Sequence, residues 1–241
     1  MFSLSSFGDR IRRQLPVECL LCKLPSEHSL PLCNSCMLEL PWLQHHCSLC
    51  ALPMPDDAEM CGQCQQQPPP WQACIASFEY RPPISQLINR FKEHRDLTAG
   101  RVLGHMLVEQ VARRLAAAAP TVDLIVPVPS HWRRRFYRGF NHSDELALQL
   151  GRQLKIPVSL YQLRKVQATH TQQGLTRSER QGNLNRAFEV VRPVNGLKVA
   201  VVDDVITTGS TARALTETLL KAGAADVQVW CVARTPAPGS L

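Results

Sequence analysis

Two adjacent carboxylates, Asp203 and Asp204, separate an apolar run from a loop of hydroxylated residues and glycine within residues 199–211. The apolar run predicts a buried parallel strand, and parallel sheets bind ligands at the carboxyl ends of their strands. A helix expected over 210–222 follows the loop, so main-chain N–H groups and hydroxyls would meet at a helix N-terminus, which suits an anion. Carboxylates beside an anion make sense if they hold hydroxyls or a divalent cation, and the pattern therefore indicates a sugar phosphate. The loop residues are Thr207, Thr208, Gly209, Ser210 and Thr211.

Other common phosphate-binding patterns are missing from the sequence. It contains neither the G-x-x-x-x-G-K-[ST] pattern of a P-loop nor the G-x-G-x-x-G pattern of a dinucleotide-binding fold. A strand with an Asp-Asp turn and hydroxyl capping would explain each feature singly. It would not explain all of them in this order.

Eight of the ten cysteines form four Cys-x-x-Cys pairs that begin every 14 residues. A two-residue gap lets both sulfurs of a pair face one ion, and two pairs complete a tetrahedral shell. The segment 17–66 has too few large apolar residues to build a core, so bound metal would supply its folding free energy. We predict a double zinc ribbon with two structural zinc ions, held by Cys19, Cys22, Cys33, Cys36, Cys47, Cys50, Cys61 and Cys64.

Two other uses of these thiols stay open. A disulfide framework would need an oxidising compartment, and the chain start has no continuous apolar core of an export signal. Four thiolates also suit an iron–sulfur cluster.

The way in which the four Cys-x-x-Cys pairs combine is also open. Sequential use of the pairs is the simplest arrangement, but crossed pairing remains an alternative. We expect the two remaining cysteines, Cys74 and Cys231, to be inert thiols of the core.

The rest of the chain alternates strand-like and helix-like patterns, which predicts an α/β fold with a mostly parallel sheet flanked by helices. Residues 1–16 carry apolar side chains at helical spacing and predict a short docking helix, and residues 67–72 form a Pro-rich linker to a domain over 73–241. Besides the strand before the acids and the helix after them, we expect strands at 73–80, 124–128 and 227–233 and helices at 84–91, 102–118 and 143–154, with a less regular stretch at 158–193.

The net charge and the hydropathy of the sequence exclude few classes of partner, but they bear on nucleic-acid and membrane binding. The formal net charge is +7, which two four-thiolate zinc sites would lower to about +3, so the total charge is weak evidence for nucleic-acid binding. The sequence has no run of about 18 apolar residues, so we expect no membrane span, and we expect a cytoplasmic location.

A basic loop (131–141) follows the strand expected at 124–128, and it contains four arginines and four aromatic residues. Arginine forks suit pyrophosphate oxygens, and the same composition suits single-stranded nucleic acid through phosphate contacts and base stacking. We take Arg133, Arg134 and Arg138 as candidates for either contact. A solvated basic loop with locally packed aromatics is the alternative.

The order of motifs resembles one family. The acidic pair and its loop resemble the phosphoribosyl-pyrophosphate (PRPP) motif of type I phosphoribosyltransferases. Together with the cysteine module and Pro-rich joint, the chain resembles the ComF family, and within it the enterobacterial GntX (YhgH) branch. The motifs are Phe91-Lys92, Pro127-Val128-Pro129, Arg138-Gly139-Phe140-Asn141, Thr171-Gln172, Arg180, Asn183, Ala187-Phe188 and the Asp-Asp loop.

This resemblance implies a type I phosphoribosyltransferase fold joined to a zinc ribbon. It implies that Asp203 and Asp204 hold the ribose hydroxyls of PRPP with magnesium nearby, and that the loop from Thr207 to Thr211 wraps the 5-phosphate. Lys92 would contact pyrophosphate or nucleic acid. A second region would lie near the ligand, with Thr171, Gln172, Arg180 and Asn183.

The resemblance also implies a role in handling DNA taken up from outside, in competence or as a nutrient, with single-stranded DNA or uptake-machinery proteins as partners. Whether phosphoribosyl transfer occurs cannot be read from the sequence, because the reaction needs no covalent side-chain nucleophile. Thr207 stands where the 6-oxopurine enzymes carry an acidic residue, which disfavours hypoxanthine or guanine salvage. A nucleotide-salvage transferase and a PRPP-sensing regulator that binds DNA or a protein remain the alternatives.

Overall fold

The computed structural model describes residues 17–27, 29–55, 58–118, 121–129, 141–166 and 187–237. The chain divides into two compact units at the bond between Leu40 and Pro41. The predicted ribbon segment, 17–66, is therefore shared between the units. The first unit contains helix α2 (Asn34–Leu38) and the first four cysteines, and the second unit contains the other four cysteines together with the sheet.

A four-stranded parallel sheet forms the centre of the second unit, as predicted. Its order is β1-β6-β5-β2, and every neighbouring pair runs parallel. The less regular stretch contributes a small antiparallel pair, β3 with β4. The strands are β1 (Ala73–Glu79), β2 (Leu124–Pro127), β3 (Leu163–Lys165), β4 (Phe188–Val190), β5 (Lys198–Ile206) and β6 (Asp226–Arg234).

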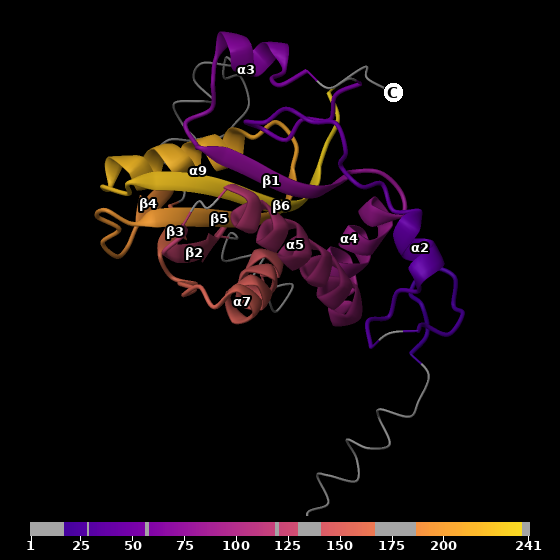
Figure 1. Cartoon of the computed structure of the whole chain (residues 1–241). Coiled ribbons are helices and arrows are strands. Elements are labelled where there is room, and N and C mark those ends of the chain that lie inside the picture. Colours follow the sequence, from indigo (N-terminus) through magenta and orange to yellow (C-terminus); the bar gives the residue numbers. More distant parts are fainter. Residues whose placement is uncertain are drawn as a thin grey trace, which may run out of the picture. The chain divides into compact units, whose positions relative to one another are not determined.

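Helices cover both faces of this sheet. In Figure 1, α4, α5 and α7 lie on one side of the strands and α9 lies on the other. Because both faces are covered, the central strands are almost continuously apolar: Val199 to Val202 and Val227 to Ala233 are buried throughout. The helices of this unit are α3 (Gly62–Gln66), α4 (Ile84–Glu93), α5 (Leu97–Ala118), α7 (His142–Leu154) and α9 (Ser210–Lys221).

Irregular segments cover the outer strands of the sheet. Along β1, the Leu43 amide donates to the Ser77 carbonyl at 3.0 Å, the Glu79 amide donates to the Pro41 carbonyl at 2.9 Å, and the Trp42 ring packs on Phe78 at 4.5 Å. Along β2, the Ile125 amide donates to the Pro157 carbonyl at 2.8 Å. The exposed edges that would otherwise promote strand pairing between molecules are thus occupied.

Two element boundaries differ from the sequence-based expectation for identifiable reasons. Helix α5 begins at Leu97 rather than at 102, because the Asp96 carboxylate accepts the amides of Thr98 and Ala99, each at 3.0 Å, and so caps a new first turn. Helix α7 begins at His142 with Asn141 as its N-cap, so Ser143 lies inside the first turn instead of opening the helix. In the described part of the chain, no helix is long and apolar enough to cross a membrane.

The fold predicts that alanine substitutions at two glycines of α5 will change the free energy of unfolding differently. A Cβ at Gly100 would lie 2.5 Å from the buried Phe91 ring, whereas one at Gly104 would meet the flexible end of Gln149. Alanine normally stabilises a helix by up to about 1 kcal/mol over glycine, but overpacking a core costs about 1–3 kcal/mol. We expect Gly100→Ala to lower the free energy of unfolding in urea and Gly104→Ala to leave it near the wild-type value. Equal effects of the two variants would contradict this packing.

Candidate functional site

The two predicted carboxylates lie within the last four residues of β5, which runs on through both of them to Ile206 because its pairing with β6 continues. Each acid has its own partner from a helix. The Ser143 hydroxyl of α7 donates to Asp203 Oδ1 at 3.3 Å, and Lys92 Nζ of α4 lies 2.9 Å from Asp204 Oδ2. The Asp204 amide also donates to Asp203 Oδ1, at 2.9 Å. Helices α4 and α7 therefore meet at the acidic pair.

The electrostatics of the pair are uneven. Burial, and next the neighbouring negative charge of Asp204, raise the pKa of Asp203 to about 7. The Asp204 amide, Lys92 and Ser143 favour the ionised form but only partly offset these effects. Near neutral pH the site thus holds one carboxylate that is paired with lysine and one that changes its charge readily.

Packing between α4 and α7 fixes the position of Lys92. The His142 ring lies edge-on to Phe91 with centroids 5.2 Å apart, and its Nε2 lies 3.3 Å from the Lys92 carbonyl oxygen. Arg90, in the last turn of α4, donates to Oδ2 of Asp96 beyond the helix end, at 2.6 and 3.0 Å. Burial alone would raise the pKa of Asp96, but hydrogen bonds from the Ala99 amide and the Arg90 guanidinium lower it. The end of α4 that carries Lys92 is therefore fixed by its contact with α7 and by the ion pair between Arg90 and Asp96.

The loop from Thr207 to Thr211 follows the acids directly and leads into α9. Thr207, Thr208 and Ser210 are exposed, and the Thr208 and Ser210 hydroxyl oxygens lie 3.0 Å apart. Gly209 is the N-cap with φ of +76°, a left-handed conformation that glycine adopts without strain. The first amides of α9 have no partner within the helix, so the loop and helix start offer donors to an anion.

A buried arginine supports this loop from beneath. Arg234, at the end of β6, is only 6% exposed, and its Nη1 donates to the carbonyl oxygens of Ile206 and Thr207. Its Nε donates to the Cys50 carbonyl oxygen at 3.1 Å. One side chain thus joins the end of β5, the start of the loop and a Cys-x-x-Cys segment.

The eight predicted metal ligands form two separate groups. Within each group, the sulfur atoms all lie within 4.8 Å of one another, and the pairs are used sequentially. The sulfurs of Cys22 and Cys33 are 3.7 Å apart, and those of Cys50 and Cys61 are 3.8 Å apart. A tetrahedron with Zn–S bonds of about 2.3 Å has edges of about 3.8 Å, so both groups fit a zinc ion. All ten cysteines are free thiols in the structure, and Cys74 and Cys231 are buried as expected.

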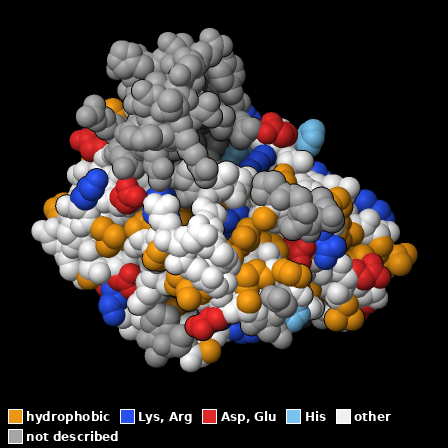
Figure 2. All heavy atoms as spheres, turned by 90° about the horizontal axis from the view of Figure 1, so that it is seen from above, with side chains coloured by type: hydrophobic (Ala, Val, Ile, Leu, Met, Phe, Trp, Pro, Cys, Tyr) orange, Lys and Arg blue, Asp and Glu red, His pale blue; other side chains and the backbone are white. Residues whose placement is uncertain are grey.

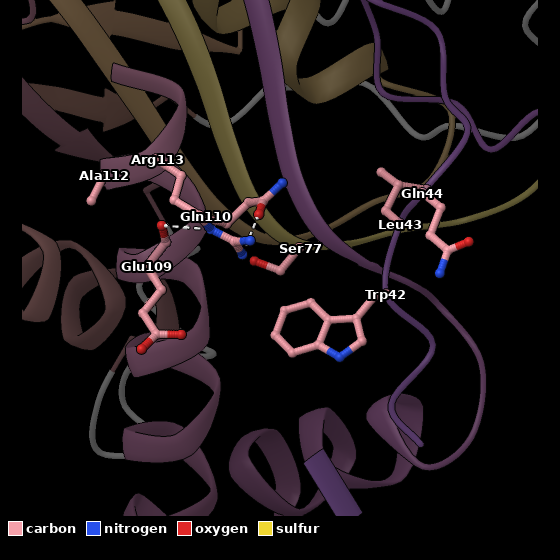
Figure 3. Close-up of a pocket in the computed structure, with 8 residues that line it drawn as sticks. All are labelled: Trp42, Leu43, Gln44, Ser77, Glu109, Gln110, Ala112 and Arg113. Atoms are coloured by element: carbon pink, nitrogen blue, oxygen red, sulfur yellow. Dashed lines mark hydrogen bonds between the residues drawn. The ribbon is translucent and has the colours of Figure 1, made fainter. Parts of the chain in front are cut away.

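A groove of about 810 Å³ lies elsewhere in the second unit, between the segment of Trp42 to Gln44 and the second half of α5 (Figure 3). Trp42 and Arg113 both line it, and Arg113 is held by Gln110 Oε1 at 2.8 Å. Of the predicted PRPP-contacting residues that the structure describes, none lines this groove. The face drawn in Figure 2 mixes acidic, basic and apolar side chains among its described residues.

The structure brings together Asp203, Asp204, Lys92 and the loop from Thr207 to Thr211. The remaining predicted contacts lie outside the described residues, as does the predicted docking helix over 1–16. They are Arg133, Arg134, Arg138, Thr171, Gln172, Arg180 and Asn183.

Comparison with known proteins identifies two domains and several relatives of this chain. Residues 11–65 match the double zinc ribbon domain and residues 137–240 match the phosphoribosyl transferase domain. The chain is 39% identical over 237 residues to the DNA utilization protein YhgH of Salmonella typhi, covering 97% of this chain and 91% of that protein. The chain belongs to the ComF family. Competence protein F of Haemophilus influenzae is another ComF relative, 35% identical over 212 residues and 86% of each chain.

Solved structures are more distant from this ComF-family chain. One is the allosteric regulatory enzyme of purine biosynthesis, which has 28% sequence identity to this chain and a TM-score of 0.37. The match covers 54% of this chain and 24% of that one. The phosphoribosyltransferase fold of the ComF-family chain is therefore assigned from its domain match and its parallel sheet with helices on both faces.

Sequence reasoning missed three residues that shape the site. The sequence predicted Ser143 only as a helix start, and it predicted no role for Arg234 or for Trp71, whose ring packs under Gly209 of the loop. A signal existed for Arg234, because a charged residue that ends a long buried strand needs hydrogen-bond partners. Ser143 gave no comparable signal, because hydroxyls are common near helix starts.

The raised pKa of Asp203 predicts a stability effect in this ComF-family protein. The folded state holds the proton more tightly than the unfolded state, so this group lowers the free energy of unfolding as pH rises from about 4 to about 7, by up to about 1.4 kcal/mol per pH unit. We expect Asp203→Asn to be more stable than wild type in urea at pH 8, with the difference shrinking toward pH 5. Glu189→Gln, in an exposed ion pair with Arg164, is the control and should show little change. A constant difference across this pH range would argue against the raised pKa.

Proposed function

We propose that this protein binds PRPP with a divalent cation at the carboxyl end of β5 and acts in the use of DNA taken up by the cell. The observation that carries the proposal is the acidic pair, with Lys92 on Asp204, followed directly by the exposed loop at the start of α9. The phosphoribosyl transferase domain match over residues 137–240 supports the same assignment.

Each part of the proposed site has a chemical task. The carboxylates of Asp203 and Asp204 would accept hydrogen bonds from the ribose hydroxyls, and the loop amides and hydroxyls would hold the 5-phosphate. Lys92 would lie beside the pyrophosphate, where its ammonium already balances Asp204. Carboxylate oxygens are also suitable ligands for Mg²⁺, which would neutralise pyrophosphate charge when bound with PRPP.

The biological assignment comes from relatives. The proteins that match nearly the whole chain carry the names DNA utilization protein and competence protein. We propose the corresponding role here, in the cytoplasm, with zinc in both four-cysteine groups and with single-stranded DNA or proteins of the uptake machinery as partners. Arg133, Arg134 and Arg138 are proposed as contacts to pyrophosphate or DNA.

Calorimetry of PRPP binding with and without Mg²⁺ tests the proposed site. We expect wild type to bind, and Asp203→Asn with Asp204→Asn to lose about 10- to 100-fold in affinity, because hydrogen bonds to charged groups contribute about 1.5–3 kcal/mol each. Affinity should also increase between pH 6 and 8, since binding requires the ionised form of Asp203, whose pKa is about 7. Glu189→Gln should bind like wild type. If wild type binds no PRPP under either condition, the proposed function is wrong.

The DNA role makes a separate prediction. We expect Arg133→Ala with Arg134→Ala to bind a fluorescent single-stranded oligonucleotide more weakly and with a shallower salt dependence, because two phosphate contacts are lost. Lys198→Ala, which removes a positive charge on an exposed side chain bonded to Thr121, controls for total charge. Equal binding by the double variant, at every salt concentration, would show that these arginines do not contact DNA.

Turnover separates the alternatives. A salvage enzyme consumes PRPP in the presence of its base, whereas a sensor or a DNA-handling protein without transferase activity binds PRPP and leaves it intact. Release of pyrophosphate from PRPP across a panel of nucleobases therefore distinguishes the salvage alternative.

A further inference from the structure

The second cysteine group belongs to the same compact unit as the sheet and is joined to it by specific bonds. Two consecutive carbonyl groups of its first Cys-x-x-Cys segment accept hydrogen bonds from side chains of the domain. The Leu49 carbonyl accepts from Trp71 Nε1 at 2.8 Å, and the Cys50 carbonyl accepts from Arg234 Nε at 3.1 Å. Trp71 and Arg234 are each 6% exposed, so both bonds are shielded from water.

The same two side chains contact the predicted 5-phosphate loop. Arg234 Nη1 donates to the carbonyls of Ile206 and Thr207, and also to Thr235 at 3.0 Å. Because a trans peptide places its N–H opposite its C=O, these bonds direct the amides of Thr207 and Thr208 away from Arg234. The guanidinium thereby fixes the orientation of two peptide groups at the start of the loop.

Trp71 supports the other part of the loop. A Cβ built on Gly209 would lie 3.4 Å from Trp71 Cη2 and 3.9 Å from Ile206 Cγ2, so the indole packs beneath the left-handed glycine. Leu43, Ala51, Trp71, Ile206 and Ala212 belong to one buried apolar cluster, and Cys50 packs against it. The cysteine segment and the loop therefore share one core.

We infer that the second cysteine group, Cys47, Cys50, Cys61 and Cys64, holds the 5-phosphate loop in its binding conformation through the positioning residues Arg234 and Trp71. The inference rests on the proposed PRPP site. It assigns different tasks to the two metal groups, since the first belongs to the other compact unit. Loss of metal from the second group, but not from the first, weakens ligand binding.

Conservative variants test the two supports without touching a cysteine. Arg234→Lys keeps the positive charge but cannot bond Cys50, Ile206 and Thr207 together, and Trp71→Phe keeps an aromatic ring but loses the bond to Leu49. We expect each to weaken PRPP binding about 3- to 30-fold in calorimetry, the range of coupling through packed networks, with two zinc ions per chain retained. Trp42→Phe, in the groove along α5, is the matched control and should bind like wild type. Wild-type affinity in both Arg234→Lys and Trp71→Phe would overturn the inference.

Cysteine variants compare the two groups directly. Cys61→Ser and Cys33→Ser each remove one buried ligand, and metal analysis reports the remaining zinc. We expect PRPP affinity to fall in Cys61→Ser and to stay near wild type in Cys33→Ser. Equal losses in the two variants would show that the groups act as one support and would overturn the assignment.

Hydrogen exchange separates failure of this inference from failure of the proposed function. The amides of Thr235 and Arg213 donate to the carbonyls of Ile206 and Gly209, at 2.9 and 2.8 Å, and so report on both ends of the loop without ligand. We expect faster exchange of these amides in Arg234→Lys, Trp71→Phe and Cys61→Ser, and unchanged exchange in Cys33→Ser. If wild type does not bind PRPP but this exchange pattern is observed, the proposed function is wrong and the inferred support of the loop is retained. If exchange of these amides is unchanged in all variants, the inferred support is wrong and the proposed function is unaffected.

Discussion

Two carboxylates on consecutive residues of a central strand are the constraint around which the rest of the second unit is arranged. A like-charged pair with Asp204 buried and Asp203 partly buried is unfavourable on its own, and burial together with the charge of Asp204 raises the pKa of Asp203 to about 7. The fold compensates with Lys92 from α4 and Ser143 from α7, which approach from two helices distant in sequence. The packing of His142 against Phe91 then follows, because it aligns the helix end that carries the lysine with the helix start that carries the serine.

The loop after the acids has a different kind of support. The acids are balanced by charge and a hydroxyl, whereas the loop is held by main-chain hydrogen bonds from Arg234 and by the indole of Trp71. A preformed loop has lost its conformational entropy before a ligand arrives, which favours binding. The acidic pair, in which Asp203 has a raised pKa, and the supported loop thus lie next to each other on β5 and its extension.

The sequence predicted those parts of the site whose pattern is local. The acidic pair with its loop and the cysteine pairs each lie within a short stretch, so residue spacing alone placed them. The bond between Lys92 and Asp204 and the contact of Ser143 with Asp203 depend on which helix ends meet β5, and the strand order β1-β6-β5-β2 is not the order of the chain. The division at Leu40 could not be predicted, because both cysteine groups share one spacing while only the second belongs to the same compact unit as the sheet.

The parallel pairing of β1 with β6 has a consequence for how the chain folds. Ala73 pairs with Gln228, so the first strand to be synthesised must wait for nearly the whole polypeptide before its neighbour exists. The cysteine groups, in contrast, each close between residues at most 17 positions apart and can capture metal while the ribosome is still extending the chain. In the nascent chain, the cysteine thiols would therefore already be bound to metal while the apolar strand β1 still lacks its partner β6.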